Sequence, residues 1–193
     1  MDLVIKNLSK NYDENEVLKE FSYTFKEGSF TCIMGKSGVG KSTLLSVLLG
    51  LENATRVDGI EPASAKYSAV FQDDCLCENL TALLNVKMVT DTVGKYSTED
   101  IVKYFKKIGI DATEKKTVAE YSGGMKRRVA ILRALLADYD FLVMDEPLKG
   151  LDEETKHDVV QLIKELTKGK TVIMTTHDME DVSDLGGEIL ELK

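Results

Sequence analysis

A glycine-rich segment at residues 35–42 carries the strongest chemical signal in the chain. It reads Gly35-Lys36-Ser37-Gly38-Val39-Gly40-Lys41-Ser42 and matches the phosphate-binding pattern G-x-x-x-x-G-K-[ST]. Its glycines allow the backbone to curl so that successive N–H groups converge on an anion, and the following helix adds its positive N-terminal end. We expect the Lys41 ammonium to reach the β- and γ-phosphates of a nucleotide and the Ser42 hydroxyl to bind Mg²⁺.

The pattern by itself is shared by ATPases, GTPases and kinases. The chain contains no Asn-Lys-x-Asp, the sequence with which many P-loop GTPases read guanine, and this favours ATP as the nucleotide. The nucleotide-binding residues expected in this segment are Gly35, Ser37, Gly38, Gly40, Lys41, Ser42 and Thr43.

Two carboxylates, Asp145 and Glu146, follow the apolar run Phe141–Met144. Such a run is typical of a buried strand, and ligands bind beyond the carboxyl ends of strands in open α/β sheets. Asp145 is suited to hold Mg²⁺ through water, and Glu146 to polarise the water that attacks a γ-phosphate. An ordinary solvated loop could begin in the same way, but the phosphate-binding segment upstream favours the catalytic interpretation.

Two further segments fit phosphate chemistry. Ser122-Gly123-Gly124 precedes a helical pattern, so a hydroxyl and bare N–H groups would lie at the positive end of a helix and form a second anion site. A plain helix N-cap would contain the same residues. His177 follows the apolar run Thr171–Thr175, where it could simply be the polar end of a strand. We interpret it as a group that stabilises developing charge on a γ-phosphate.

Apolar runs typical of strands alternate along the chain with residue spacings typical of helices. These elements must position the groups described above. Strands are predicted at Asp2–Leu8, Phe21–Phe25, Phe30–Met34, Ser68–Phe71, Phe141–Met144 and Thr171–Thr175, and helices at about 41–49, after the capping box of Ser97 and Asp100, after Gly124 and at Glu153–Thr167. We expect an α/β fold: a P-loop NTPase (RecA-like) core with a mainly parallel sheet, N-terminal antiparallel strands and an inserted α-helical lobe. Residues 1–193 would form one domain, with the lobe at about 73–125.

The motifs together resemble those of the nucleotide-binding subunits of ABC transporters. Gln72 is similar to the family's Q-loop glutamine, and Tyr121-Ser122-Gly123-Gly124-Met125 to its signature motif. Leu151-Asp152 is similar to the D-loop, and His177 to the switch histidine. Tyr12 stands where the family places an aromatic ring against adenine. With the phosphate-binding segment and the Asp145-Glu146 strand, these motifs follow the family's order over nearly the whole chain.

The resemblance implies roles for the individual residues. The catalytic group would be Lys41, Gln72, Glu146 and His177, and the Mg²⁺ ligands would be Ser42, Gln72 and Asp145. Tyr12, Ser122, Gly123, Gly124 and Asp152 would add to the ATP-binding residues of the glycine-rich segment. ATP and Mg²⁺ would be the cofactors.

The resemblance also implies partners. Two ATPase subunits would form a head-to-tail dimer when ATP is bound, most simply a homodimer, in which the signature of one completes the ATP site of the other. The helical lobe, around Asp73–Ala82, would transmit this motion to an integral-membrane permease subunit. The motor would drive transport from the cytoplasm, peripherally bound to the inner face of the cell membrane.

Some residues of these motifs differ from the commonest form in the family. The signature has Tyr121 and Met125 in place of Leu and Gln, and Lys149-Gly150 is unusual before the D-loop. Ser-Gly-Gly-Met followed by basic residues, together with Phe71-Gln72-Asp73-Asp74, resembles the nitrate, sulfonate and taurine importer ATPases. The transported substrate and its direction stay open at this stage.

Composition limits the alternatives. The formal net charge of -8 disfavours a nucleic-acid partner, and no apolar run approaches the ~20 residues that cross a bilayer. Cys75 and Cys77 form a bare C-x-C that is weak as a metal or redox signal, and free thiols are expected. The alternative function is a soluble ABC-type ATPase acting on a non-transport partner, although no coiled-coil heptads or second phosphate-binding segment are present. An inactive ABC-like binding module or a small-molecule kinase fits the intact motifs less well.

Overall fold

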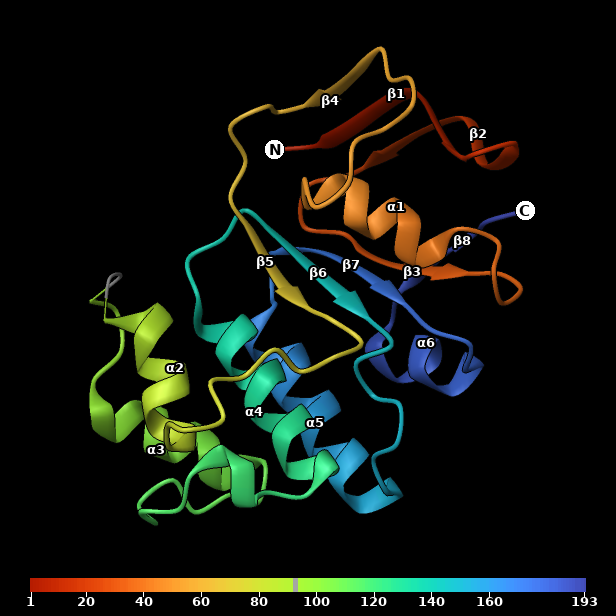
Figure 1. The fold of residues 1–193 in the computed structure, drawn as a ribbon. Helices are drawn as coiled ribbons and strands as arrows, with labels where there is room; N and C mark the ends of the chain where they lie inside the picture. The colour runs from red at the N-terminus through yellow and green to blue at the C-terminus, as the bar shows by residue number, and fades with distance from the viewer. Residues whose placement is uncertain (92–93) are drawn as a thin grey trace.

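A five-stranded parallel sheet forms the centre of the computed structural model, which describes residues 1–91 and 94–193 (Figure 1). Its strands lie in the order β5-β6-β7-β3-β8, and every neighbouring pair is parallel. Their bounds are β3 Phe30–Met34, β5 Tyr67–Val70, β6 Phe141–Asp145, β7 Thr171–Thr175 and β8 Glu188–Glu191. The predicted α/β class with a mainly parallel sheet is confirmed.

A second, antiparallel sheet of three strands stands above the first, in the order β2-β1-β4 (Figure 1). Its strands are β1 Leu3–Tyr12, β2 Asn15–Phe25 and β4 Gly59–Glu61. The first two are longer than the sequence predicted. Asn7 and Glu20 adopt positive φ angles and the register shifts along the pair, which interrupts the apolar alternation on which the prediction depended.

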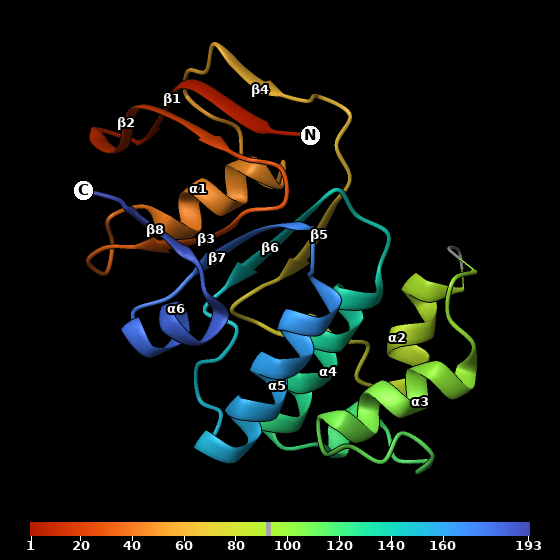
Figure 2. The ribbon, with the colours of Figure 1, turned by 180° about the vertical axis from the view of Figure 1, so that it is seen from behind.

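The helices occupy both sides of the parallel sheet (Figures 1 and 2). Helix α1 lies between the two sheets, α4 and α5 lie on the opposite side of the parallel sheet, and α2 and α3 lie beyond α4. Their bounds are α1 Lys41–Leu48, α2 Ala82–Thr90, α3 Thr98–Lys107, α4 Gly123–Leu136, α5 Glu153–Leu166 and α6 Met179–Leu185, with a short 3-10 turn at Val118–Glu120. The predicted capping box of Ser97 and Asp100 is present. Helices α2 and α3 and the start of α4 fall in the range of the predicted lobe, whose bounds stay a prediction.

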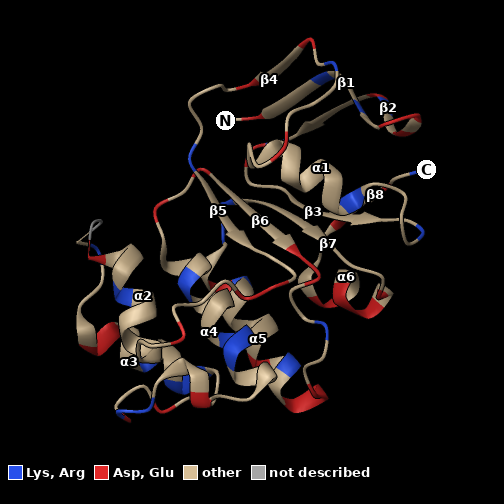
Figure 3. Ribbon diagram, viewed as in Figure 1, with Lys and Arg blue, Asp and Glu red and all other residues tan. Residues whose placement is uncertain are grey.

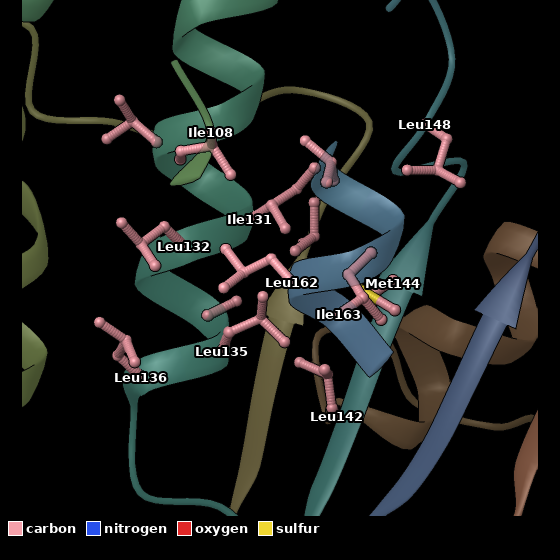
Figure 4. Close-up of a cluster of buried hydrophobic side chains, with 14 of the residues drawn as sticks. Ile108, Ile131, Leu132, Leu135, Leu136, Leu142, Met144, Leu148, Leu162 and Ile163 are labelled. Atoms are coloured by element: carbon pink, nitrogen blue, oxygen red, sulfur yellow. The ribbon is translucent and has the colours of Figure 1, made fainter. Parts of the chain in front are cut away.

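The central strands of the parallel sheet are buried on both faces, whereas the edge strand β8 is largely exposed. Along β6, Phe141 and Val143 pack in the layer that holds α1 and the antiparallel sheet, whereas Leu142 and Met144 pack in the layer of α4 and α5 (Figure 4). This double burial explains why the central strands read as unbroken apolar runs. It also makes β6 a rigid support for the two carboxylates at its end.

Within residues 1–91 and 94–193, no helix combines the length and the apolar character that crossing a membrane requires.

Candidate active site

The glycine-rich loop joins β3 to α1 and curls over the side chain of Lys41. Gly40 adopts φ +106°, and a Cβ there would lie 2.8 Å from Cγ1 of Val17. At Gly35 a Cβ would lie 2.5 Å from the carbonyl oxygen of Leu192, so both positions require glycine. The Lys41 ammonium donates 3.0 Å hydrogen bonds to the carbonyl oxygens of Gly35 and Lys36, and the residue is only 7% exposed. The carbonyl oxygens of the loop therefore hold the Lys41 ammonium beside the loop.

A pocket of about 340 Å³ opens beside this loop. The pocket brings residues that follow three separate strands close to the loop. This is possible because β5, β6 and β7 all end at the same edge of the sheet. The sequence-predicted residues that line it are Ser37, Gly38, Gly40, Lys41, Ser42, Thr43, Gln72, Glu146 and His177, and Val17 and Lys149 line it as well.

Thr175, on β7, contacts the carboxylate of Asp145 and the backbone N–H of Glu146 at the end of β6. It is the register partner of Asp145, and its hydroxyl donates a 2.5 Å hydrogen bond to Asp145 Oδ1. The Glu146 N–H donates to the same hydroxyl oxygen at 2.9 Å. Glu146 adopts φ +45°, a strained angle for a residue with a side chain, and leaves the sheet at this point. Figure 3 shows the acidic end of β6 in red.

The carboxylate of Glu146 lies between two basic side chains. Lys149 Nζ is 2.5 Å from Oε2, and His177 Nε2 is 2.9 Å from Oε1. The hydrogen bond from Lys149 lowers the pKa of Glu146; partial burial opposes this, and the charges of Lys149, His177 and Lys41 lower the pKa further. The structure therefore favours an ionised Glu146.

The oxygen donors at this edge suit Mg²⁺, a hard cation that prefers carboxylate, hydroxyl and carbonyl ligands. Thr175 occupies Oδ1 of Asp145, and Oδ2 has no hydrogen-bond partner in the described part of the chain. The Ser42 hydroxyl and the Gln72 side chain line the adjoining pocket. These residues fit the ion that the sequence predicts.

Other predicted residues lie away from this pocket. Tyr12 ends β1, is 42% exposed, donates its hydroxyl to Glu52 and has the Lys10 ammonium 4.8 Å from its ring centre. Ser122 caps α4 by accepting the N–H of Met125 at 3.3 Å, with Gly123 and Gly124 in the first turn. Asp152 caps α5 by accepting the N–H of Thr155 at 2.9 Å. In the part of the chain that the structure describes, none of these five residues lines the pocket.

Three residues of the site were missed by sequence reasoning. Thr175 ends an apolar run, and nothing local marks its hydroxyl as a contact of the next strand. Val17 lies against Gly40 from the antiparallel sheet, which no motif indicates. Lys149 was noted in the sequence only because Lys149-Gly150 is an unusual pair before Leu151-Asp152.

Comparisons with known proteins identify the family to which the chain is similar. A family model described as ABC transporter matches residues 18–149. The macrolide export ATP-binding/permease protein MacB of Mannheimia succiniciproducens is 34% identical over 212 residues, covering 98% of this chain and 33% of that protein. The aliphatic sulfonates import ATP-binding protein SsuB of Bacillus cereus is 33% identical over 195 residues, covering 97% of this chain and 78% of that protein.

A solved structure is similar along the whole chain. The dimeric structure of a post-hydrolysis state of the ATP-binding cassette MJ0796, bound to ADP and Pi, has a TM-score of 0.83 at 30% identity, covering 99% of this chain and 94% of that one. The chain thus spans a third of MacB but nearly all of this cassette.

Proposed function

The chain belongs to the ABC transporter family, and we propose that it is the ATP-binding and ATP-hydrolysing subunit that drives a membrane transporter. The observation that carries this proposal is the pocket that joins the glycine-rich loop to Gln72, Glu146 and His177. These groups come from separate strands and meet only in the folded chain. Similarity to a cassette bound to ADP and Pi supports ATP as the substrate.

Each residue has a distinct part in the proposed reaction. Lys41 and the loop N–H groups hold the β- and γ-phosphates. Glu146 accepts a proton from water as the water oxygen bonds to the γ-phosphorus and the bond to the bridging oxygen breaks, which releases ADP and phosphate. His177, whose Nε2 lies 2.9 Å from Glu146 Oε1, would leave that carboxylate and donate a hydrogen bond to a γ-phosphate oxygen where negative charge develops. Mg²⁺, held by Ser42, Asp145 and Gln72, would neutralise phosphate charge when bound.

The signature segment would act at the ATP site of a second copy of the chain. Ser122 and the glycines after it are at the exposed N-terminus of α4, and Asp152 is at the N-terminus of α5, both outside the chain's own pocket. A head-to-tail homodimer would bring each signature to the ATP of the other subunit, where the helix end would bind the γ-phosphate. The exposed ring of Tyr12 would stack on adenine. The dimeric state of the similar cassette supports this arrangement.

The partner in the membrane would be an integral permease subunit, which this chain would serve from the cytoplasmic face. The relatives include an aliphatic sulfonates import protein and a macrolide export protein of nearly equal identity, so identity alone does not set the direction of transport. The wording of the signature motif resembles that of the nitrate, sulfonate and taurine importers, and this favours import.

Co-purification tests the transporter assignment. The tagged full chain is recovered from membranes solubilised in mild detergent, and the proteins bound to it are identified. A multi-spanning membrane protein is expected. Recovery from the soluble fraction alone, together with ribosomes or a coiled-coil protein, would refute the transporter assignment. The protein would then be a soluble ABC-type ATPase that acts on a non-transport partner.

A further inference from the structure

Lys149 is a second lysine in the nucleotide pocket, and no motif accounts for it. It lies in the turn between β6 and α5, and it lines the same pocket as Lys41. We propose that Lys149 is a positioning residue for ATP hydrolysis, which holds the Glu146 carboxylate in the orientation that accepts a proton from water. This role rests on the proposed function of the site.

The backbone of the turn fixes Lys149 relative to Glu146. The Lys149 N–H donates to the Glu146 carbonyl oxygen at 3.3 Å, and the Leu151 N–H donates to the Leu148 carbonyl oxygen at 3.4 Å. Leu148 is buried, and Asp152 then begins α5. The turn therefore holds the backbone of Lys149 close to Glu146, and the ammonium reaches the Glu146 carboxylate.

The contacts from Lys149 and His177 go to different oxygens of the Glu146 carboxylate. Lys149 binds Oε2 at 2.5 Å and His177 approaches Oε1 at 2.9 Å. An ionised carboxylate offers about four lone-pair positions, so each oxygen keeps one that is free to accept a proton. The carboxylate can therefore serve as a base while it is held. The contact to His177 is an ion pair only when that ring is protonated, which leaves Lys149 as the permanent charge.

A positioning role differs from that of an ordinary surface ion pair. Glu146 and Lys149 both line the pocket, and their side chains are 16% and 64% exposed. An exposed pair without a function would affect stability by about 0–1 kcal/mol and leave catalysis unchanged. Orientation of a reacting group, by contrast, affects the rate of the chemical step and leaves substrate binding intact.

Variants of Lys149 in the full chain separate these roles. Lys149→Met removes the charge, Lys149→Arg keeps it, and Lys66→Met removes a lysine of similar exposure, 65%, that pairs with Asp138 at 2.6 Å on a different surface. The measurements are kcat and KM for ATP with Mg²⁺, and the Kd of a fluorescent ATP analogue without metal.

Lys149→Met is expected to lower kcat on the order of tenfold, with KM and Kd within about twofold of the parent. Lys149→Arg is expected to recover most of kcat, and Lys66→Met to match the parent. An unchanged or higher kcat in Lys149→Met would overturn the proposal. A raised KM and Kd at constant kcat would also overturn it, because Lys149 would then bind the phosphates. A parental chain without ATPase activity would instead refute the proposed function, and the role of Lys149 with it.

Discussion

The guanidinium of Arg127 donates a 2.8 Å hydrogen bond to the carbonyl oxygen of Gln72. It donates a second, of 2.5 Å, to the carbonyl oxygen of Phe71 and lies 3.2 Å from Asp74 Oδ1. Arg127 is buried on α4, the helix that Ser122 caps. The helix that carries the signature therefore holds the main chain of the residue whose side chain lines the nucleotide pocket.

Removing this guanidinium should destabilise the protein. Arg127→Met leaves two carbonyl oxygens and the half-buried Asp74 without their partner, and we expect the free energy of unfolding to fall by about 3 kcal/mol. Arg127→Lys should lose less, although one ammonium cannot reproduce the two-pronged contact. Urea unfolding measures the change. The neighbouring Lys126→Met, which breaks a more exposed pair with Glu78, should cost about 0–1 kcal/mol, and an equal loss in both variants would contradict the expectation.

Glu146→Gln should separate binding from turnover. The amide preserves the shape of the side chain but accepts a proton poorly, so we expect ATPase turnover to fall at least about 100-fold while ATP binding persists. Because hydrolysis would no longer reopen the dimer, ATP should shift the variant to a dimer in size-exclusion chromatography. Glu165→Gln, which alters a surface pair with Lys107, is the control. Hydrolysis at the parental rate in Glu146→Gln would refute the assignment of the base.

Two glycines of the phosphate-binding loop should respond differently to alanine. Both Gly38 and Gly40 have positive φ, but a Cβ at Gly38 meets nothing within 4 Å, whereas a Cβ at Gly40 lies 2.8 Å from Val17 Cγ1. Each alanine carries the cost of a left-handed angle, about 1–2 kcal/mol, and Gly40→Ala adds overpacking of about 1–3 kcal/mol. Thermal or urea unfolding without nucleotide should show the larger loss for Gly40→Ala. The double variant Gly40→Ala/Val17→Ala should recover part of the difference.

The buried thiol of Cys32 should make stability depend on alkaline pH. Burial raises the pKa of Cys32 from its ordinary 9.0 to about 11, and the charge of Asp181 acts in the same direction. Between these values the unfolded chain releases a proton that the folded protein retains, so unfolding becomes easier as the pH rises. This contribution is fully present below pH 9.

The decline in the midpoint of urea unfolding between pH 8 and 10.5 should therefore be smaller in Cys32→Ala than in the parent. Cys75 is exposed, and Cys75→Ala should decline as the parent does. An identical decline in all three proteins would show that the Cys32 thiol does not contribute.

Local spacing explains which features could be predicted from sequence. The phosphate-binding loop and the Asp145-Glu146 pair are contiguous, so residue types alone indicated their chemistry and the strands that precede them. Thr175 and Arg127 act on residues far away in the chain, through strand register and helix packing, and neither has a local signature. Strands β4 and β8 and helices α2 and α6 were not predicted individually, because each is short and gains its stability from neighbours.

The place of β3 in the sheet has a consequence for the order of folding. Its two neighbours are β7 and β8, so Phe30 pairs with Val172 and Thr31 with Glu188, and the carbonyl oxygen of Leu192 closes against Gly35. Pairings between such distant residues close long loops and form slowly. During synthesis, the strand that leads into the phosphate-binding loop is made before either partner. We expect the loop to be completed late in folding, because β3 stays unpaired until β7 and β8 have been made. A chain arrested before that point would lack a complete phosphate-binding loop.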